Sequence, residues 1–215
     1  MTASAVIFDL DGVLTDTAEF HYQSWKTLAD ELGIPFDRRA NDALRGLGRA
    51  ESLAILLGRR SGEFGESRQA DMLRRKNELY LTRVAQMTPA DLLPGAGALL
   101  ASLRAAGIRV AVGSSSKNAR TVIDRLGIRP LLNVVIDGHD APRSKPDPQV
   151  FLLAAERLGV EPSACVVVED AESGVEAGLH AGMRVIGVGP PGRVGRAHRI
   201  VAATENLTLE MILAK

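Results

Sequence analysis

"VIFDLDGVLTD", from Val6 to Asp16, places an apolar run directly before two carboxylates. The run "VIF" consists of residues that favour strands, and its lack of polar positions predicts a strand buried on both faces. Asp9 and Asp11 follow two positions apart, and in extended chain such residues point to the same side. Two carboxylates that close repel each other unless a cation or a shared proton relieves them. The stretch therefore predicts a charged site at the end of a strand.

Similar apolar runs recur along the chain and alternate with helical patterns. The predicted strands are 5–10, 108–114, 133–138, 164–170 and 184–189. The predicted helices are 97–107, 119–127, 149–159 and 173–182, each closed by a glycine. Continuous apolar strands that alternate with helices predict a parallel sheet covered on both faces, which is an α/β Rossmann-like core.

The alternation is interrupted from about Thr17 to Pro89, where only helical patterns occur. The segment "TPADLLPGAG", 88–97, has two prolines and two glycines and is typical of a linker. We therefore predict a catalytic core over 1–16 and 92–215 and an inserted helical cap domain over 17–91. Because the chain crosses between the two parts twice, hinges are expected near 16–18 and 88–94.

Composition excludes several classes of function. The chain has 215 residues and a formal net charge of zero, so no basic surface for nucleic acid is indicated. No apolar run is long enough to span a membrane, and the first residues lack a signal-peptide pattern. The single cysteine, Cys165, lies in the apolar stretch "ACVVVED", which indicates a buried, inert thiol. We expect a cytoplasmic monomer that acts on small molecules, without nucleic-acid or membrane partners.

Polar residues end four of the predicted strands, and the carboxyl ends of parallel strands share one edge of a sheet. The residues at these ends are Asp9 and Asp11, Ser114 to Asn118 ("SSSKN"), Lys145 in "RSKPDP", and Glu169 with Asp170. If these ends meet, four carboxylates and one lysine leave a negative excess. A hard cation with oxygen ligands resolves that excess, and Mg²⁺ is the usual one where phosphates bind.

The same residue types suit phosphoryl transfer. Lys145, Ser114 and nearby backbone N–H groups are suited to holding a phosphate. A carboxylate beside Mg²⁺ and a phosphate can act as a nucleophile and form an aspartyl phosphate. A neighbouring carboxyl can give a proton to the leaving oxygen and later recover it. We assign attack to Asp9 and proton transfer to Asp11.

Four motifs resemble those of the haloacid dehalogenase superfamily of phosphotransferases, in the same order over the whole chain. They are "DLDGVLTDT", the serine after the second strand, "SKPDP" and "EDAESGVEAG". The resemblance implies Mg²⁺ held by the Asp9 side chain, the Asp11 carbonyl and Asp170, with Glu169 close by. It also implies that Ser114 and Lys145 hold the transferring phosphate, with a cis peptide between Lys145 and Pro146.

Further stretches, including "DGVLTDTAEFHYQSWKTLADELG" and "RKNELY", resemble the sugar-phosphate mutases of this superfamily. From the cap, the resemblance implies that the sugar phosphate is faced by His21, Trp25, Arg49, Ser52 and Lys76. From the core, it implies that the distal phosphate is bound by Ser116, Lys117 and Asn118.

The activity implied is an isomerisation in carbohydrate metabolism, β-D-glucose 1-phosphate to D-glucose 6-phosphate. It would proceed through phospho-Asp9 and glucose 1,6-bisphosphate. A sugar-phosphate phosphatase that uses the same Asp9 chemistry with water as acceptor is the alternative. A third reading is a receiver domain that signals through phospho-aspartate. The large cap and Asp11, which would speed loss of the phosphate, argue against it.

Each residue type also has a plain structural explanation. The aspartate pair could mark a turn, and Glu169 with Asp170 could begin the next helix. His21 and Trp25, four residues apart, could simply pack on one helix face. Arg49 and Lys76 could be surface charges. The basic stretch "GPPGRVGRAHR", 189–199, is interpreted as a solvated loop.

Overall fold

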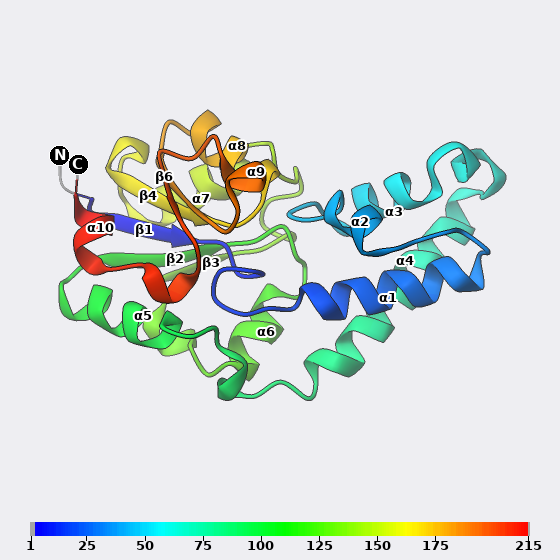
Figure 1. Ribbon diagram of the computed structural model, residues 1–215, viewed down its shortest axis with the longest axis horizontal. Helices are drawn as coiled ribbons and strands as arrows, with labels where there is room; N and C mark the ends of the chain where they lie inside the picture. Colours follow the sequence, from blue (N-terminus) through cyan, green and yellow to red (C-terminus); the bar gives the residue numbers. More distant parts are fainter. Residues whose placement is uncertain (1–2, 215) are drawn as a thin grey trace.

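Six strands form one parallel sheet in this computed structural model, which describes residues 3–214 (Figure 1). The order across the sheet is β3-β2-β1-β4-β5-β6, and every neighbouring pair is parallel. The strands are β1 Ala5–Phe8, β2 Arg109–Gly113, β3 Val134–Ile136, β4 Cys165–Glu169, β5 Arg184–Val188 and β6 Arg199–Val201. The Rossmann-like α/β fold predicted from the sequence is therefore present, and all five predicted strands are confirmed.

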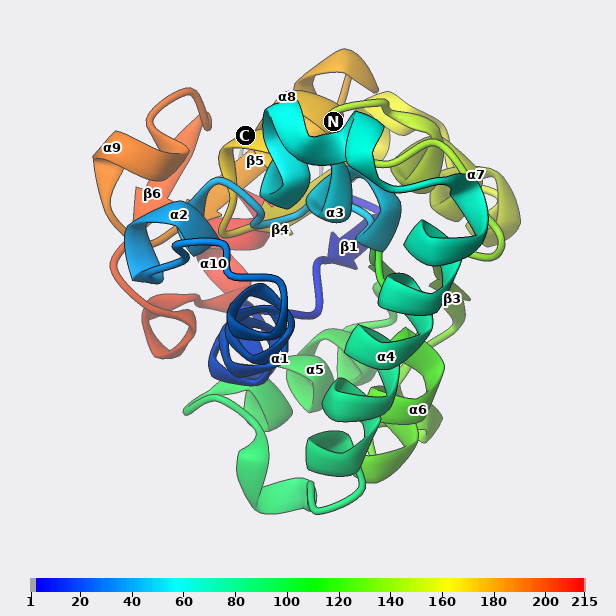
Figure 2. The same cartoon turned by 90° about the vertical axis from the view of Figure 1, so that its right-hand side faces the viewer.

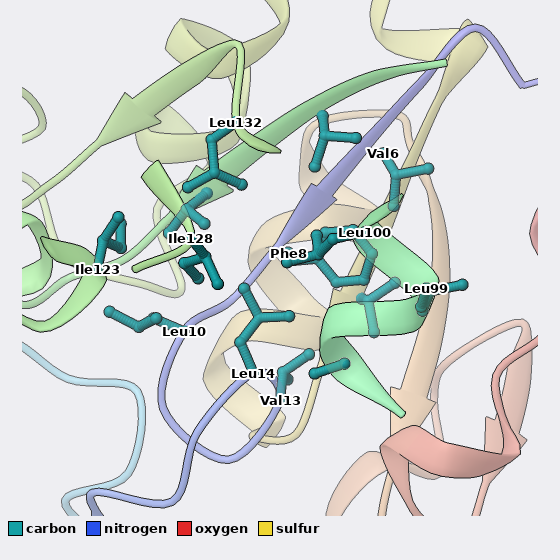
Figure 3. Packing of buried hydrophobic residues seen from close by; sticks show 14 of the residues in the cluster. Val6, Phe8, Leu10, Val13, Leu14, Leu99, Leu100, Ile123, Ile128 and Leu132 are labelled. Carbon is teal, nitrogen blue, oxygen red and sulfur yellow. The ribbon is translucent and has the colours of Figure 1, made fainter. Parts of the chain in front are cut away.

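Helices cover both faces of this sheet (Figure 1). One face carries α5 Ala96–Ala105, α6 Ala119–Arg125 and α10 Leu209–Leu213, and the other carries α7 Gln149–Leu158, α8 Glu172–His180 and α9 Pro191–Val194. Successive residues of a strand serve opposite faces: Phe8 belongs to the cluster with Leu100 of α5 (Figure 3), whereas Ile7 belongs to the cluster with Phe151 of α7. Burial of strand side chains on both faces explains why these strands are continuously apolar.

Short 3₁₀ helices occupy several of the connections. They are η1 Gly58–Glu63, η2 Pro89–Asp91, η3 Arg129–Leu131, η4 Pro162–Ala164 and η5 Thr204–Asn206. The glycines predicted to end helices adopt the positive φ that such a position requires, as at Gly159, with φ of 64° after α7. The stretch 189–199 is more structured than predicted, because it contains α9 and begins β6. An edge strand of three residues buries too little apolar surface to show a strand pattern in the sequence.

Four helices inserted between β1 and β2 form a separate lobe (Figures 1 and 2). They are α1 Ala18–Glu31, α2 Arg38–Asp42, α3 Arg49–Leu57 and α4 Glu66–Val84. The lobe has its own apolar cluster, in which Trp25 and Leu28 of α1 pack with Leu53 of α3 and Met72 of α4. The insertion is helical as predicted, and the exact boundaries 17–91 and 92–215 stay a prediction. Over residues 3–214, no helix is both long and apolar enough to cross a bilayer.

Candidate active site

A cavity of about 230 Å³ lies between the cap helices and the carboxyl edge of the sheet. Its lining includes, from the core, Asp9, Asp11, Ser114, Ser116, Lys117, Asn118 and Asp170, and from the cap, His21, Trp25, Arg49, Ser52 and Lys76. Two further predicted site residues, Lys145 and Glu169, are fully buried next to Asp9 rather than lining the cavity. The structure thus gathers the predicted residues in one place, and their individual roles stay predictions.

Lys145 joins two of the carboxylates below the cavity. Its Nζ lies 2.6 Å from Asp9 Oδ1 and 2.7 Å from Glu169 Oε1. Burial alone would lower the pKa of Lys145, but Asp9 and Glu169 outweigh it and raise that pKa. The peptide between Lys145 and Pro146 is cis, as predicted. Lys145 is therefore a fixed positive charge beside the expected nucleophile.

Three carboxylates lie close enough to share a cation. Oxygen atoms of Asp9, Glu169 and Asp170 all lie within 4.8 Å of one another, and all three residues are buried. Burial, with repulsion from Asp9 and, for Glu169, also from Asp170, raises the pKa values of Glu169 and Asp170 to about 7. An all-oxygen donor set with excess negative charge fits a hard divalent cation such as Mg²⁺. The Asp11 side chain is not part of this set, and the resemblance assigned only its carbonyl to the ion.

Asp11 has different surroundings from Asp9. The Thr17 hydroxyl, fully buried at the start of α1, donates a hydrogen bond to Asp11 Oδ1. Burial, and then the charge of Asp9, raise the pKa of Asp11 to about 6. A carboxyl group whose pKa is near neutral pH can both give and take a proton, as a general acid and base must. Thr17 was not among the predicted residues, although its position in "DLDGVLTDT" was visible.

The cap supplies a buried lysine. Lys76 is 2% exposed, and its Nζ lies 2.9 Å from His21 Nδ1 and 4.9 Å from the ring centroids of Trp25 and Tyr80. The idea that Lys76 is a surface charge is therefore wrong. Burial, and then repulsion from Arg49, lower the pKa of Lys76 to about 7. The packing explanation for Trp25 holds in part, since Trp25 belongs to the cap cluster and also lines the cavity.

The residues predicted to bind a second phosphate also line the cavity. Arg49 begins α3, and burial lowers its pKa. Across from the cap, the turn before α6 is tightened by hydrogen bonds from Ser116 N–H to Ser114 Oγ (3.1 Å) and from Asn118 N–H to Ser116 Oγ (3.2 Å). Lys117 in this turn is exposed and still contributes to the lining. Positive groups therefore occur both beside Asp9 and at Arg49 and Lys117.

Several contacts bring the cap onto the core. Arg45, between α2 and α3, lies 3.1 Å from Asp170 Oδ2, and Asn118 donates to Asn77 Oδ1 of α4 at 2.8 Å. A Cβ atom at Gly48 would lie 2.3 Å from Ser144 Oγ, so the two parts approach closely there. Arg45, Asn77 and Ser144 were not predicted, because no local pattern in the sequence distinguishes a charged or polar residue that faces another domain. These contacts close the cavity on the cap side.

Comparison with known proteins agrees with this arrangement. The family model of haloacid dehalogenase-like hydrolases matches residues 3–182. The chain is 42% identical over 210 residues to a β-phosphoglucomutase of Bacillus subtilis (strain 168), covering 97% of this chain and 93% of that protein. A β-phosphoglucomutase crystal structure from Clostridium difficile has a TM-score of 0.95 at 37% identity, covering 98% and 95% of the chains. The chain is also 30% identical to the Escherichia coli (strain K12) fructose-1-phosphate phosphatase YqaB, covering 86% and 96%.

Proposed function

The chain belongs to the haloacid dehalogenase-like hydrolase family, and from this premise we propose that it is an isomerase that interconverts β-D-glucose 1-phosphate and D-glucose 6-phosphate. The observation that carries the proposal is the cavity of about 230 Å³ between cap and core. It holds a nucleophilic carboxylate and an acid–base carboxyl at one place and further positive groups at another. A mutase needs both groups of residues, because it must bind the two phosphates of its bisphosphate intermediate at the same time.

The residues of this chain perform each transfer in a defined way. Asp9 attacks the phosphorus of a sugar phosphate, so a carboxylate–phosphorus bond forms as the bond to the sugar oxygen breaks. Asp11 gives its proton to that leaving oxygen. In the next transfer Asp11 takes the proton from a sugar hydroxyl, whose oxygen attacks the phosphorus of phospho-Asp9 and releases the carboxylate. The raised pKa of Asp11, about 6, suits both directions.

Charge around Asp9 makes this attack possible. Lys145, hydrogen-bonded to Asp9 at 2.6 Å, neutralises one negative charge and orients the carboxylate. A Mg²⁺ ion held by Asp9, Asp170 and the Asp11 carbonyl, with Glu169 nearby, would supply the positive charge that screens the phosphoryl group from the carboxylates. To Ser114, which is buried at the end of β2 and lines the cavity, we assign a hydrogen bond to the transferring phosphate.

The cap determines whether a sugar hydroxyl or water accepts the phosphoryl group. A closed cap excludes water, which would otherwise take the phosphoryl group and make the enzyme a phosphatase. We assign the distal phosphate to Arg49, with Ser116, Lys117 and Asn118 opposite, and the sugar hydroxyls to His21, Lys76 and Ser52. Trp25 forms an apolar wall beside them.

Arg49→Ala tests the second phosphate site. Loss of a charged hydrogen bond to a ligand commonly costs roughly 2–5 kcal/mol, and each 1.4 kcal/mol is about tenfold in rate. Mutase turnover should therefore fall by about two to three orders of magnitude. Phosphorylation of Asp9 by acetyl phosphate, which has no distal phosphate, should change little. Arg68→Ala, an exposed arginine at the start of α4, is the matched control.

The phosphatase alternative is supported by relatives that are phosphatases, among them the fructose-1-phosphate phosphatase. Product analysis separates the two functions: wild-type protein is supplied with β-glucose 1-phosphate, Mg²⁺ and a trace of bisphosphate. Glucose 6-phosphate supports the mutase, and free phosphate supports the phosphatase. If Arg49→Ala slows neither turnover of β-glucose 1-phosphate nor phosphorylation of Asp9 by acetyl phosphate, no second phosphate is bound at Arg49. The mutase proposal then loses its main support.

We further propose that the protein is a cytoplasmic monomer that binds only small sugar phosphates and carries its phosphate on Asp9 during turnover. One chain supplies both walls of the cavity, so no second copy is needed to complete it. Charged sugar phosphates do not diffuse across bilayers, and an enzyme that supplies glucose 6-phosphate to metabolism inside the cell is therefore expected in the cytoplasm. Light scattering at working concentration tests the monomer, and mass spectrometry of acid-quenched enzyme tests phospho-Asp9.

A further inference from the structure

Arg193 of α9 holds Asp170 at two points. Its Nε donates to the Asp170 backbone carbonyl at 2.6 Å, and its Nη2 lies 3.6 Å from Asp170 Oδ2. One planar guanidinium therefore contacts both the main chain and the carboxylate of the same residue. Asp170 itself is almost wholly buried, with 5% of its side chain exposed. This contact lies in the basic stretch 189–199, to which the proposed function assigns no role.

The local chain makes room for the contact. Gly189 follows β5 with φ of 120°, a conformation that side-chain-bearing residues rarely adopt. A Cβ atom at Gly189 would lie 2.7 Å from Arg193 Nη2, so a larger residue would push the guanidinium away. α9 then turns back over the carboxyl end of β4, which brings Arg193 to Asp170.

Arg193 does not line the cavity proposed for the sugar. It lines a second cavity of about 290 Å³, whose lining also includes Asp170 and Arg45. Asp170 thus lies in the wall between the two cavities, with Arg193 behind it. An effect of Arg193 on the reaction should therefore act through Asp170 and not through contact with substrate.

We propose that Arg193 is a positioning residue that orients Asp170 to bind the divalent cation. The proposal rests on the cation site of the proposed function. Residues that hydrogen-bond to metal ligands fix ligand orientation, and their loss commonly weakens metal binding by roughly 10- to 100-fold.

Two effects of Arg193 on a cation oppose each other. Its positive charge repels a cation, while its hydrogen bond to the Asp170 carbonyl and its ion pair with the Asp170 carboxylate hold the ligand in place. The side chain is 31% exposed, so solvent and salt screen its charge. The hydrogen bond from Nε ends on a carbonyl of a buried residue, where no such screening applies. Orientation should therefore outweigh repulsion.

The test compares Arg193→Gln, Arg193→Lys and wild type by Mn²⁺ binding, followed by electron paramagnetic resonance of the free ion. Arg193→Gln should weaken Mn²⁺ binding roughly 10- to 100-fold. Arg193→Lys keeps the charge but not the two-point contact, so its affinity should lie between the two. In turnover assays, the KM for Mg²⁺ should rise, while kcat at saturating Mg²⁺ and the KM for sugar phosphate change little.

Arg196→Gln is the matched control. Arg196 lies in the same stretch but is 70% exposed and pairs with Glu176 at 2.5 Å, away from Asp170. Its loss should leave Mn²⁺ affinity within about twofold, in line with the small effects of exposed ion pairs. Melting curves in EDTA show whether each variant is folded. If Arg193→Gln does not fold, the comparison between Arg193→Lys and wild type decides the test.

Unchanged or tighter Mn²⁺ binding by folded Arg193 variants would overturn the positioning role and leave the proposed function intact. Asp170→Asn tests the cation site separately from the role of Arg193, since it should abolish the tight Mn²⁺ site. If Asp170→Asn binds Mn²⁺ as wild type does, the cation site of the proposed function is wrong and the role of Arg193 falls with it. Weakened binding by the Arg193 variants, with Arg196→Gln unaffected, supports the inference.

Discussion

At the scale of single residues, the site contains several groups whose charged forms are opposed by their surroundings. Burial raises the pKa of Asp11 to about 6 and lowers that of Lys76 to about 7. A fold selected only for stability would avoid both. Such perturbed groups gathered in one cavity are typical of catalytic sites, where pKa values near neutral pH are useful. Burying Asp11 and Lys76 destabilises the fold locally, and it brings their pKa values into the range that proton transfer requires.

Lys76→Met should stabilise the protein while abolishing mutase turnover. The pKa of Lys76 is about 7 in the folded protein and 10.5 ordinarily, so the unfolded chain binds the extra proton between these values. The cost of charging Lys76 is therefore full below pH 7 and fades as pH rises toward 10.5. One pKa unit is about 1.4 kcal/mol, and contacts with Trp25, Tyr80 and His21 offset part of the cost. We expect a gain in unfolding free energy of about 1–3 kcal/mol at pH 6.

Urea denaturation in EDTA at pH 6 and pH 9 checks this prediction. The gain should shrink by roughly 2 kcal/mol between the two pH values, because at pH 9 the folded protein holds Lys76 uncharged and no longer bears the full cost of its charge. Lys26→Met is the control, since Lys26 is an exposed lysine of α1 that pairs with Asp30. A gain that does not depend on pH would mean that the charge on Lys76 is not opposed by the fold.

At the scale of elements, the site depends on how closely α8 approaches the end of β4. Gly174 lies in the first turn of α8, and a Cβ atom there would lie 1.8 Å from Glu169 Oε1. Glu169 is in turn held by Lys145 at 2.7 Å and by the Ala171 N–H at 2.8 Å. The helix can therefore start at this point only because residue 174 has no side chain.

Gly174→Ala should destabilise the protein strongly even though alanine favours helices. The added methyl group must displace the Glu169 carboxylate from Lys145, and breaking a buried ion pair costs roughly 3–5 kcal/mol. Helix propensity returns only about 1 kcal/mol, so a net loss of about 2–4 kcal/mol is expected in urea denaturation. Gly62→Ala is the control, because nothing lies within 4 Å of a Cβ atom there. Equal stability of the two variants would contradict the placement of Glu169.

The helices and strands that could be predicted are those that a pattern in the local sequence specifies. Five strands were predicted because their apolar runs are long, and α7 because its pattern ends at Gly159. β6 and α9 were missed because each buries few residues. Among site residues, Asp9 and Asp170 follow strands directly and were found. Tyr80 and Arg193 contribute only through contacts made by the folded chain, and neither has a spacing that reveals them.

At the scale of the whole molecule, the cavity exists because two separately packed parts meet. The cap has its own apolar cluster, and the C-terminal part of its last helix, α4, also buries Tyr80 and Val84 in the apolar cluster of the core. Around the cavity the two parts also meet through polar contacts, such as the one between Asn77 and Asn118. Polar contacts of this kind cost little to break, because water replaces the lost hydrogen bonds. A cap that opens to admit sugar phosphate and closes during transfer is the expected behaviour.

A reversible crosslink between cap and core tests this cycle of opening. A Cβ atom at Gly48 would lie 2.3 Å from Ser144 Oγ, which is within reach of a disulfide between cysteines at these positions. The native Cys165 is buried, and its pKa is raised to about 11 by burial, so it should not exchange with the new pair. In the Gly48→Cys, Ser144→Cys double variant, oxidation should lower turnover by about 100-fold or more, because neither substrate nor product can pass. Reduction should restore the rate of the same protein, and intact mass shows how much crosslink has formed. Each single variant should show the same turnover before and after treatment with the oxidant, because it cannot form the crosslink. Full turnover by crosslinked protein would show that sugar phosphate reaches Asp9 without cap opening, and the hinges expected near 16–18 and 88–94 would then have no role in the reaction.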